Sequence, residues 1–258
     1  MKFFSKLVGA PRRLMNKAKS IVIVDRRKLH IFLENQSLRK LFETIEVEVL
    51  LDVGANAGQY GKATRSAGYS GRLISFEPLP DLARSMKYEA RNDHSWEIRN
   101  EAVIPTHQES IKFKRMKSSQ MSSFKPPKES SVEAVNEINQ VIEEIEVKTT
   151  TLPAVLSELG STSKIMLKLD TQGLDGELLR ANEGLLERFS VIQVELSFEA
   201  IYEGSDDWKM VVDLLEKQGF FIAAIFPNNA GHFPRLIEQD ALFVNERLIS
   251  ASPICDLK

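Results

Sequence analysis

The sequence predicts a doubly wound α/β domain, in which helices cover both faces of a mostly parallel sheet of seven strands. Two observations support this prediction. From residue 47 onward, short apolar segments alternate with helix-like segments, which is typical of repeating β-α units. The chain has 258 residues, 43% of them hydrophobic, which is long enough to bury one full-sized core. We therefore expect a main domain over residues 47–258, preceded by a helical extension over residues 1–46.

The expected strands are short runs rich in Val, Ile, Leu and Phe, bounded by polar or glycine-containing segments. They span residues 47–53, 72–76, 96–103, 165–169, 191–196, 220–226 and 242–244. The expected helices span residues 81–90, 176–189 and 207–218. Gly219 follows the last of these helices, where a helix C-cap is expected.

Two segments lie outside this alternation. Residues 1–46 have apolar side chains at helical spacings, so this extension is expected to cap the core. Residues 104–159 form a long insertion after the third strand. It contains a stretch rich in Ser, Lys and Pro over residues 117–131 and an acidic, helix-like segment over residues 132–145. Long insertions of this kind tend to be functional lids or disordered linkers, and we expect part of this one to be mobile.

Charge and cysteine content narrow the classes of function. The formal net charge of −2 gives no basic field for a nucleic acid, so no nucleic-acid partner is expected. Cys255 is the single cysteine, which excludes an intrachain disulfide and favours a reducing cytoplasm. Residues 1–20 are basic but have no apolar run long enough for a signal peptide or a membrane span. This segment is either a packed surface helix or an amphipathic helix on an anionic membrane.

The most informative motif is the glycine-containing turn at residues 50–58, LLDVGANAG. Gly54 and Gly58 let the backbone pass close to a ligand, and the free N–H groups at the start of the following helix point to the same place. Asn56, between the two glycines, is expected to help hold the cofactor. The spacing differs from the three-glycine fingerprint of dinucleotide enzymes. Asp52 would repel a pyrophosphate but favour the positive charges of S-adenosylmethionine.

A second motif, ISFEP at residues 74–78, follows about one β-α unit later. Glu77 can accept hydrogen bonds from both hydroxyls of a ribose, and Pro78 then turns the chain. A solvated strand-end acid is the alternative for Glu77 taken alone, and the preceding glycine turn favours the binding role. At the end of the third strand, Asn100 and Glu101 either contact the adenine side of a cofactor or simply form a turn.

Together with residues 165–177, IMLKLDTQGLDGE, these motifs resemble the FkbM family of S-adenosylmethionine-dependent methyltransferases in order and spacing. The Lys-x-Asp-x-x-Gly run of the third block is the most particular to that family. The resemblance covers residues 47–198 and implies a class I, Rossmann-like methyltransferase fold with a closing antiparallel strand. It implies S-adenosylmethionine as cofactor and a hydroxyl acceptor on a small molecule such as a sugar, glycan or natural product. Asp175 and Glu177 straddle Gly176, which departs from the family's pattern and leaves a role for either acid open.

Asp170 and Gln172 follow the strand at 165–169, and the ligand crevice of such sheets opens at this end of the strands. We therefore expect both side chains to face the methyl donor and acceptor. Transfer to oxygen also requires a base for the hydroxyl proton. Asp170 is the first candidate, and the alternatives are His232, in a loop after the sixth strand, and Glu195, near the end of the fifth. No metal is expected, although a divalent ion between Asp170 and Glu195 stays an alternative.

Two other classes of protein share parts of this pattern. A regulatory module could keep the nucleoside pocket without catalysis, although the retained Asp170 argues against it. A nicotinamide-dependent oxidoreductase shares the sheet but lacks the three-glycine fingerprint. The serines of the insertion resemble a serine-rich stretch that lies near cofactor and acceptor in the family, and a flexible linker is the other interpretation. These serines are Ser118, Ser119, Ser122 and Ser123. The oligomeric state is left open.

Overall fold

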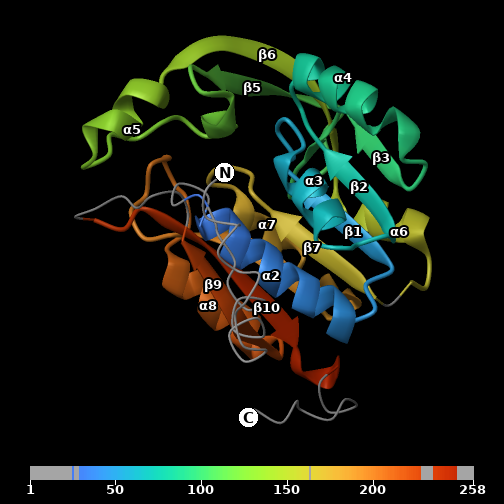
Figure 1. Cartoon of the computed structure of the whole chain (residues 1–258). Helices are drawn as coiled ribbons and strands as arrows, with labels where there is room; N and C mark the ends of the chain where they lie inside the picture. Colours follow the sequence, from blue (N-terminus) through green and yellow to red (C-terminus); the bar gives the residue numbers. More distant parts are fainter. Residues whose placement is uncertain (1–24, 26–28, 163, 228–234, 249–258) are drawn as a thin grey trace, which may run out of the picture.

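The computed structural model describes residues 25, 29–162, 164–227 and 235–248. A seven-stranded sheet lies at its centre, in the order β3-β2-β1-β7-β8-β10-β9 (Figure 1). β1 pairs in parallel with β2 and β7, and β10 runs antiparallel to both β8 and β9. The predicted doubly wound, mostly parallel sheet of seven strands with an antiparallel closing strand is thus confirmed.

The bounds of the elements agree with the sequence pattern over most of the chain. The strands of the main sheet are β1 Val49–Val53, β2 Arg72–Phe76, β3 Trp96–Arg99, β7 Ile165–Leu169, β8 Phe189–Ser197, β9 Phe220–Pro227 and β10 Glu238–Asn245. The helices that accompany it are α2 Leu29–Thr44, α3 Gln59–Ser66, α4 Pro80–Glu89, α6 Leu152–Leu159, α7 Asp175–Ala181 and α8 Trp208–Lys217. Short 3₁₀ helices follow at Ala90–Asn92, Glu183–Arg188 and Glu246–Leu248. None of the helices in the described residues is long and apolar enough to cross a bilayer.

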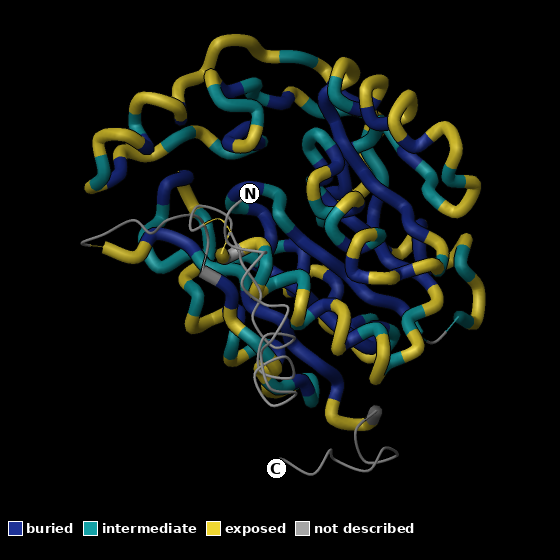
Figure 2. Tube along the Cα trace, viewed as in Figure 1, coloured by how far each residue is buried: buried dark blue, intermediate teal, exposed yellow. Residues whose placement is uncertain are grey.

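The two faces of the sheet bury different cores, because successive side chains of a strand point to opposite sides. Leu51 and Val53 of β1 belong to the larger core, with α6, α7 and α8. Leu50 points to the other face, where Leu38 and Leu41 of α2 cover it. The central strands β1, β7 and β8 are accordingly among the most deeply buried parts of the described chain, as Figure 2 shows. Helix α2 therefore caps one face of the core, as expected for the end of the extension.

The insertion contains β5 Ser110–Met116, a 3₁₀ helix at Ser119–Met121, α5 Glu133–Ile138 and β6 Val141–Thr150, and the short strand β4 Ala102–Val103 directly precedes it. β5 and β6 pair antiparallel, and with β4 they form a separate three-stranded sheet that arches over one end of the domain (Figure 1).

Three predicted elements need correction. The acidic helix over residues 132–145 ends at Ile138, because the β-branched run that follows pairs with β5 and places Glu144 opposite Lys114. The strand over residues 96–103 is divided between two sheets, since β3 ends at Arg99. The helix over residues 176–189 ends early at Ala181 and continues as a 3₁₀ helix.

Candidate active site

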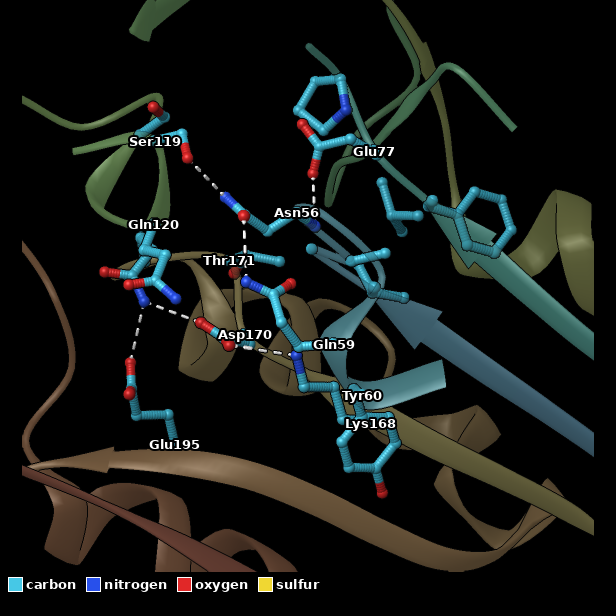
Figure 3. A pocket seen from close by; sticks show the side chains of 18 of the residues that line it. Asn56, Gln59, Tyr60, Glu77, Ser119, Gln120, Lys168, Asp170, Thr171 and Glu195 are labelled. Atoms are coloured by element: carbon cyan, nitrogen blue, oxygen red, sulfur yellow. Dashed lines mark hydrogen bonds and ion pairs between the residues drawn. The ribbon is translucent and has the colours of Figure 1, made fainter. Parts of the chain in front are cut away.

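A cavity of about 390 Å³ opens at the carboxyl ends of β1, β2 and β7 (Figure 3). The turn after β1 and the Glu77-Pro78 segment after β2 form one end of it. Residues that follow β7 and the first turns of α2 form other parts of the wall. The 3₁₀ helix Ser119–Met121 brings the insertion to the same cavity. The cavity therefore lies where ligands bind in doubly wound sheets.

The glycine turn packs the end of β1 against the end of β7. Gly54 has a φ of +83°, and a Cβ there would lie 1.9 Å from the carbonyl oxygen of Asp170. Gly58, with a φ of +75°, begins α3. Asn56 also has a positive φ, and its Nδ2 donates to Ser119 Oγ over 3.2 Å. The backbone that Gly54 lets approach is thus the chain's own, which fixes Asp170 beside the turn.

Glu77 is held in place by backbone donors. Its Oε2 accepts a hydrogen bond from the N–H of Asn56 over 2.7 Å, and its Oε1 accepts one from the N–H of Leu79 over 2.8 Å. Only 4% of Glu77 is exposed, and this burial raises its pKa to about 8. Each oxygen keeps acceptor capacity for a further donor. Glu77 therefore offers a fixed, two-oxygen acceptor to a ligand in the cavity.

Asp52 is not among the residues that line the cavity, so its expected contact with a cofactor stays a prediction. Its side chain is fully buried, and it accepts a hydrogen bond from Ser75 Oγ over 2.9 Å. Its Oδ1 lies 3.7 Å from Lys168 Nζ. Burial raises the pKa of Asp52, and the nearby ammonium of Lys168 opposes this. Asp52 is the penultimate residue of β1, so its side chain points to a face of the sheet rather than to the edge where the strand ends.

Lys168 connects this buried acid to the cavity. Its Nζ lies 3.0 Å from Asp170 Oδ2, and it sits 5.4 Å from the centre of the Tyr60 ring. Burial lowers the pKa of Lys168, but the surrounding carboxylates of Asp170 and Asp52 outweigh that effect and raise it overall. Only 6% of the lysine side chain is exposed, whereas 33% of the Asp170 side chain is open. A buried cation thus holds Asp170 at the cavity surface.

Gln172 fixes the other oxygen of Asp170. Its Nε2 donates to Asp170 Oδ1 over 2.7 Å and to Glu195 Oε2 over 3.1 Å. Its Oε1 accepts from the hydroxyl of Tyr202, and its carbonyl accepts from Ser123 Oγ. These contacts hold Gln172 at a φ of +56°, a conformation that non-glycine residues rarely adopt. The structure brings Asp170, Gln172 and Glu195 together, as the sequence predicted for the reacting end.

Two further acids lie at this end of the cavity. Glu238 and Asp240 of β10 line it together with Glu195 of β8. Burial and neighbouring carboxylates raise the pKa of Glu195, that of Glu238 to about 8 and that of Asp240 to about 7. Sequence reasoning missed both β10 acids, because they precede the apolar run that marked the strand. Their alternate spacing on a strand was the signal that could have found them.

The remaining expected site residues divide into three groups. Pro78 and Glu101 line the cavity. Asn100 does not line it, because its Nδ2 donates to the carbonyl oxygens of Glu77 and Pro78, each over 2.9 Å. It therefore shapes the turn after β2, and its expected contact with the adenine side of a cofactor stays a prediction. His232 lies outside the described residues.

The serine stretch of the insertion lies at the cavity. Ser119 and Ser122 line the cavity, and Ser123 Oγ donates to the carbonyl of Gln172. The stretch is therefore part of the site rather than a linker. Within the described residues, no group of three or more His, Cys, Asp or Glu side chains is arranged to hold a metal ion.

Comparison with solved structures gives distant similarities. Fibrillarin of Aeropyrum pernix with natively bound S-adenosyl-L-methionine has 12% identity and a TM-score of 0.44, over 82% of this chain and 74% of that one. Magnesium protoporphyrin IX methyltransferase of Synechocystis PCC 6803 has 9% identity and a TM-score of 0.44, over 91% of this chain and 90% of that one. Similarity at this level carries no conclusion about the chemistry of this chain.

Comparison with sequences is more decisive. No curated protein matches the chain. The family described as the Methyltransferase FkbM domain matches residues 52–222, which include the glycine turn, Glu77 and the Asp170 segment. This match covers more than half of the chain and confirms the resemblance seen in the sequence. The chain therefore belongs to the FkbM methyltransferase domain family, whose members are S-adenosylmethionine-dependent methyltransferases.

Proposed function

We propose that the protein methylates a hydroxyl oxygen of a small molecule, such as a sugar, a glycan unit or a natural product. The observation that supports this most is the setting of Asp170. Its two oxygens are held by Lys168 and Gln172, while a third of its side chain is exposed and the residue lines the cavity. A fixed carboxylate at the carboxyl end of a central strand suits the removal of a hydroxyl proton.

The cofactor would occupy the end of the cavity near β1 and β2. When bound, S-adenosylmethionine supplies a methyl carbon activated by a positively charged sulfur. The residues fit it, because Glu77 has acceptor capacity left on both oxygens for the two ribose hydroxyls. Glu101 and Pro78 would line the adenine side. Asp170 lies on the other side of the glycine turn, beside the expected place of the reacting carbon.

Asp170 would act as acceptor of the hydroxyl proton, and Lys168 and Gln172 are its positioning residues. An alkyl hydroxyl is scarcely acidic in water, so a nearby base and correct alignment are both required. Glu195, which shares Gln172 with Asp170, is a second candidate, since its raised pKa would make it the stronger base once ionised. His232 remains a third candidate from sequence. We expect the enzyme to act in the cytoplasm and not on nucleic acid.

Mass spectrometry after co-purification tests the cofactor, because bound S-adenosylhomocysteine would be retained from the expression host. Transfer from labelled S-adenosylmethionine to a panel of sugars and natural-product alcohols then tests the atom methylated. We expect a methyl ether as product. We also expect Asp170→Asn to bind S-adenosylhomocysteine normally and to lose at least about a hundredfold in turnover, within the range for general base catalysis.

A matched control is Glu216→Gln, an exposed acid of α8 that does not line the cavity. It should keep normal turnover. Methyl groups found only on nitrogen or carbon would contradict O-methylation, and unchanged turnover in Asp170→Asn would contradict its role as base.

A further inference from the structure

The cavity carries more negative charge than cofactor binding and proton removal use. Among the described residues that line it, seven are acids and one is a base. The acids are Glu34, Glu77, Glu101, Asp170, Glu195, Glu238 and Asp240. The base, Lys168, is committed to Asp170 and Asp52. We call Glu195, Glu238 and Asp240 the acidic wall, because β8 and β10 bring these three to one side of the cavity.

The pairing of β10 with β8 brings the three residues of the acidic wall close together. Asp240 lies directly opposite Glu195 in the antiparallel pairing of β10 with β8. Glu238 is two residues from Asp240 on the same strand, so both side chains leave the same face. Like charges directly opposite across a strand pair destabilise a sheet. The pairing of β8 with β10 is therefore less stable at the edge of the cavity than it would be without these like charges.

Glu238 is the clearest member of the wall. Only 8% of it is exposed, yet it lines the cavity, and its carboxyl group makes no hydrogen bond or ion pair within the described residues. The carboxyl group of Asp240 also makes none in the same part of the chain. A buried, unpaired carboxyl group such as that of Glu238 is costly unless something compensates it. A group from the ligand is the natural partner for Glu238 and for the half-buried Asp240 beside it.

We infer that the acidic wall binds an ammonium group on the methyl acceptor, which makes the acceptor an amine-bearing alcohol such as an amino sugar. This inference rests on the proposed function, since it identifies the class of hydroxyl acceptor. The wall lies beside Asp170, so an ammonium group held there would leave a neighbouring hydroxyl within the reacting end of the cavity. A cation also has a Coulombic attraction to three carboxyl groups that a neutral alcohol lacks.

The charged groups around Glu238 and Asp240 determine whether amine binding releases protons. The pKa values of Glu238 and Asp240 are affected by the charged groups around them and by each other. These groups are Lys168 of β7, Asp170 after β7, Glu195 of β8, Glu34 of α2 and Asp175 of α7. The hydroxyl of Tyr202 lies nearby. Burial and the surrounding carboxylates raise the pKa of Glu238, so the folded protein favours its protonated form in the absence of a ligand. An ammonium group would favour its ionised form. Amine binding should therefore release protons, whereas a neutral alcohol should release none.

Calorimetric titration of the full chain, saturated with S-adenosylhomocysteine, tests this inference. The probes are two matched pairs: glucosamine against glucose, and ethanolamine against ethylene glycol. Titrations in two buffers of different ionisation enthalpy measure the protons released. We expect each amine to bind at least about tenfold more tightly than its neutral counterpart and to release protons.

Variants of Glu238 and Asp240 test whether the acidic wall causes the preference for the amine. Glu238→Gln and Asp240→Asn should each remove most of the preference for the amine, and Glu216→Gln should leave it unchanged. Two wall variants are used so that a folding defect in one, seen as a lowered melting temperature, leaves the other to decide. Equal binding within each pair overturns the inference. It is also overturned if no amine binds at tens of millimolar, or if both wall variants keep the preference.

The same titrations separate this inference from the proposed function. Binding of S-adenosylhomocysteine is measured first, in the absence of any probe. If it binds normally but no amine preference is found, the acidic wall is refuted and the methyltransferase proposal stands. If amines bind preferentially but are never O-methylated, the proposed reaction is refuted and the cation site stands.

Discussion

Replacing Lys168 with methionine is the most informative perturbation of the site. Methionine keeps the length of the apolar stem but removes the ammonium group that lies between two carboxylates. Asp52 Oδ1 is 3.7 Å from the lysine Nζ, and Asp170 Oδ2 is 3.0 Å from it. Lys168→Met leaves Asp52 with one side-chain hydrogen bond, from Ser75, and no nearby cation among the described residues.

The expected loss of stability follows from burial. The lysine side chain is 6% exposed and that of Asp52 is 0% exposed, so this is a buried pair. Removal of one partner of a buried pair costs about 3 to 5 kcal/mol. We expect a value near the lower end, about 3 kcal/mol, because Asp170 is partly solvated and Asp52 can take up a proton. The double variant Asp52→Asn/Lys168→Met should recover at least about 1 kcal/mol of this, since it leaves no buried charge.

Urea unfolding followed by circular dichroism measures these differences, provided that the slopes with denaturant stay equal. Lys148→Met is the matched control, because Lys148 is exposed on β6, and it should change stability by less than about 0.5 kcal/mol. The reasoning fails if Lys168→Met costs less than about 1 kcal/mol, or if the double variant is no more stable than the single one.

Three further predictions concern the turn, the acidic wall and the reacting end. Gly54→Ala should cost at least about 3 kcal/mol, because the added Cβ would meet the Asp170 carbonyl; thermal unfolding should show a much smaller loss for Gly68→Ala, where φ is also positive but the space is open. The pKa of Glu238 is raised from 4.5 to about 8 on folding, so the stability it contributes is full below pH 4.5 and is lost as the pH rises through 8. Glu238→Gln should flatten this dependence in urea titrations, and a parallel profile would contradict the assignment. Gln172→Ala should reduce turnover by at least about tenfold with little change in affinity for S-adenosylhomocysteine, and an equal loss in both would place Gln172 in cofactor binding instead.

The features that could be predicted from sequence are those with a local physical cause. The alternation of apolar runs and helical segments located the sheet, because burial on both faces requires it. Gly54 and Glu77 were expected at the cavity because each follows the end of a strand, and both line it in the structure. Asp170 and Gln172 followed from the same rule for strand ends.

The errors arose where a long-range contact decides the structure. Asp52 was expected at the cavity, but its side chain points to the face of the sheet, where it is fully buried and its Oδ1 lies 3.7 Å from Lys168 Nζ. Residues 141–145 combine two acids with β-branched residues, and their pairing with β5 makes them a strand rather than the end of the expected acidic helix. Glu238 and Asp240 were missed because they precede the apolar run that marked the strand, and strand pairing with β8 brings them to the site from a distant part of the sequence.

The most direct test of this account is calorimetric titration of S-adenosylhomocysteine into the wild-type protein and into Glu77→Ala. We expect saturable binding at one site in the wild type. We expect a loss of at least about tenfold in the variant, because both ribose hydroxyls lose their acceptor. Absence of binding to the wild-type protein, or equal affinity in the variant, would contradict the assignment of the cavity at β1, β2 and β7 as the cofactor site.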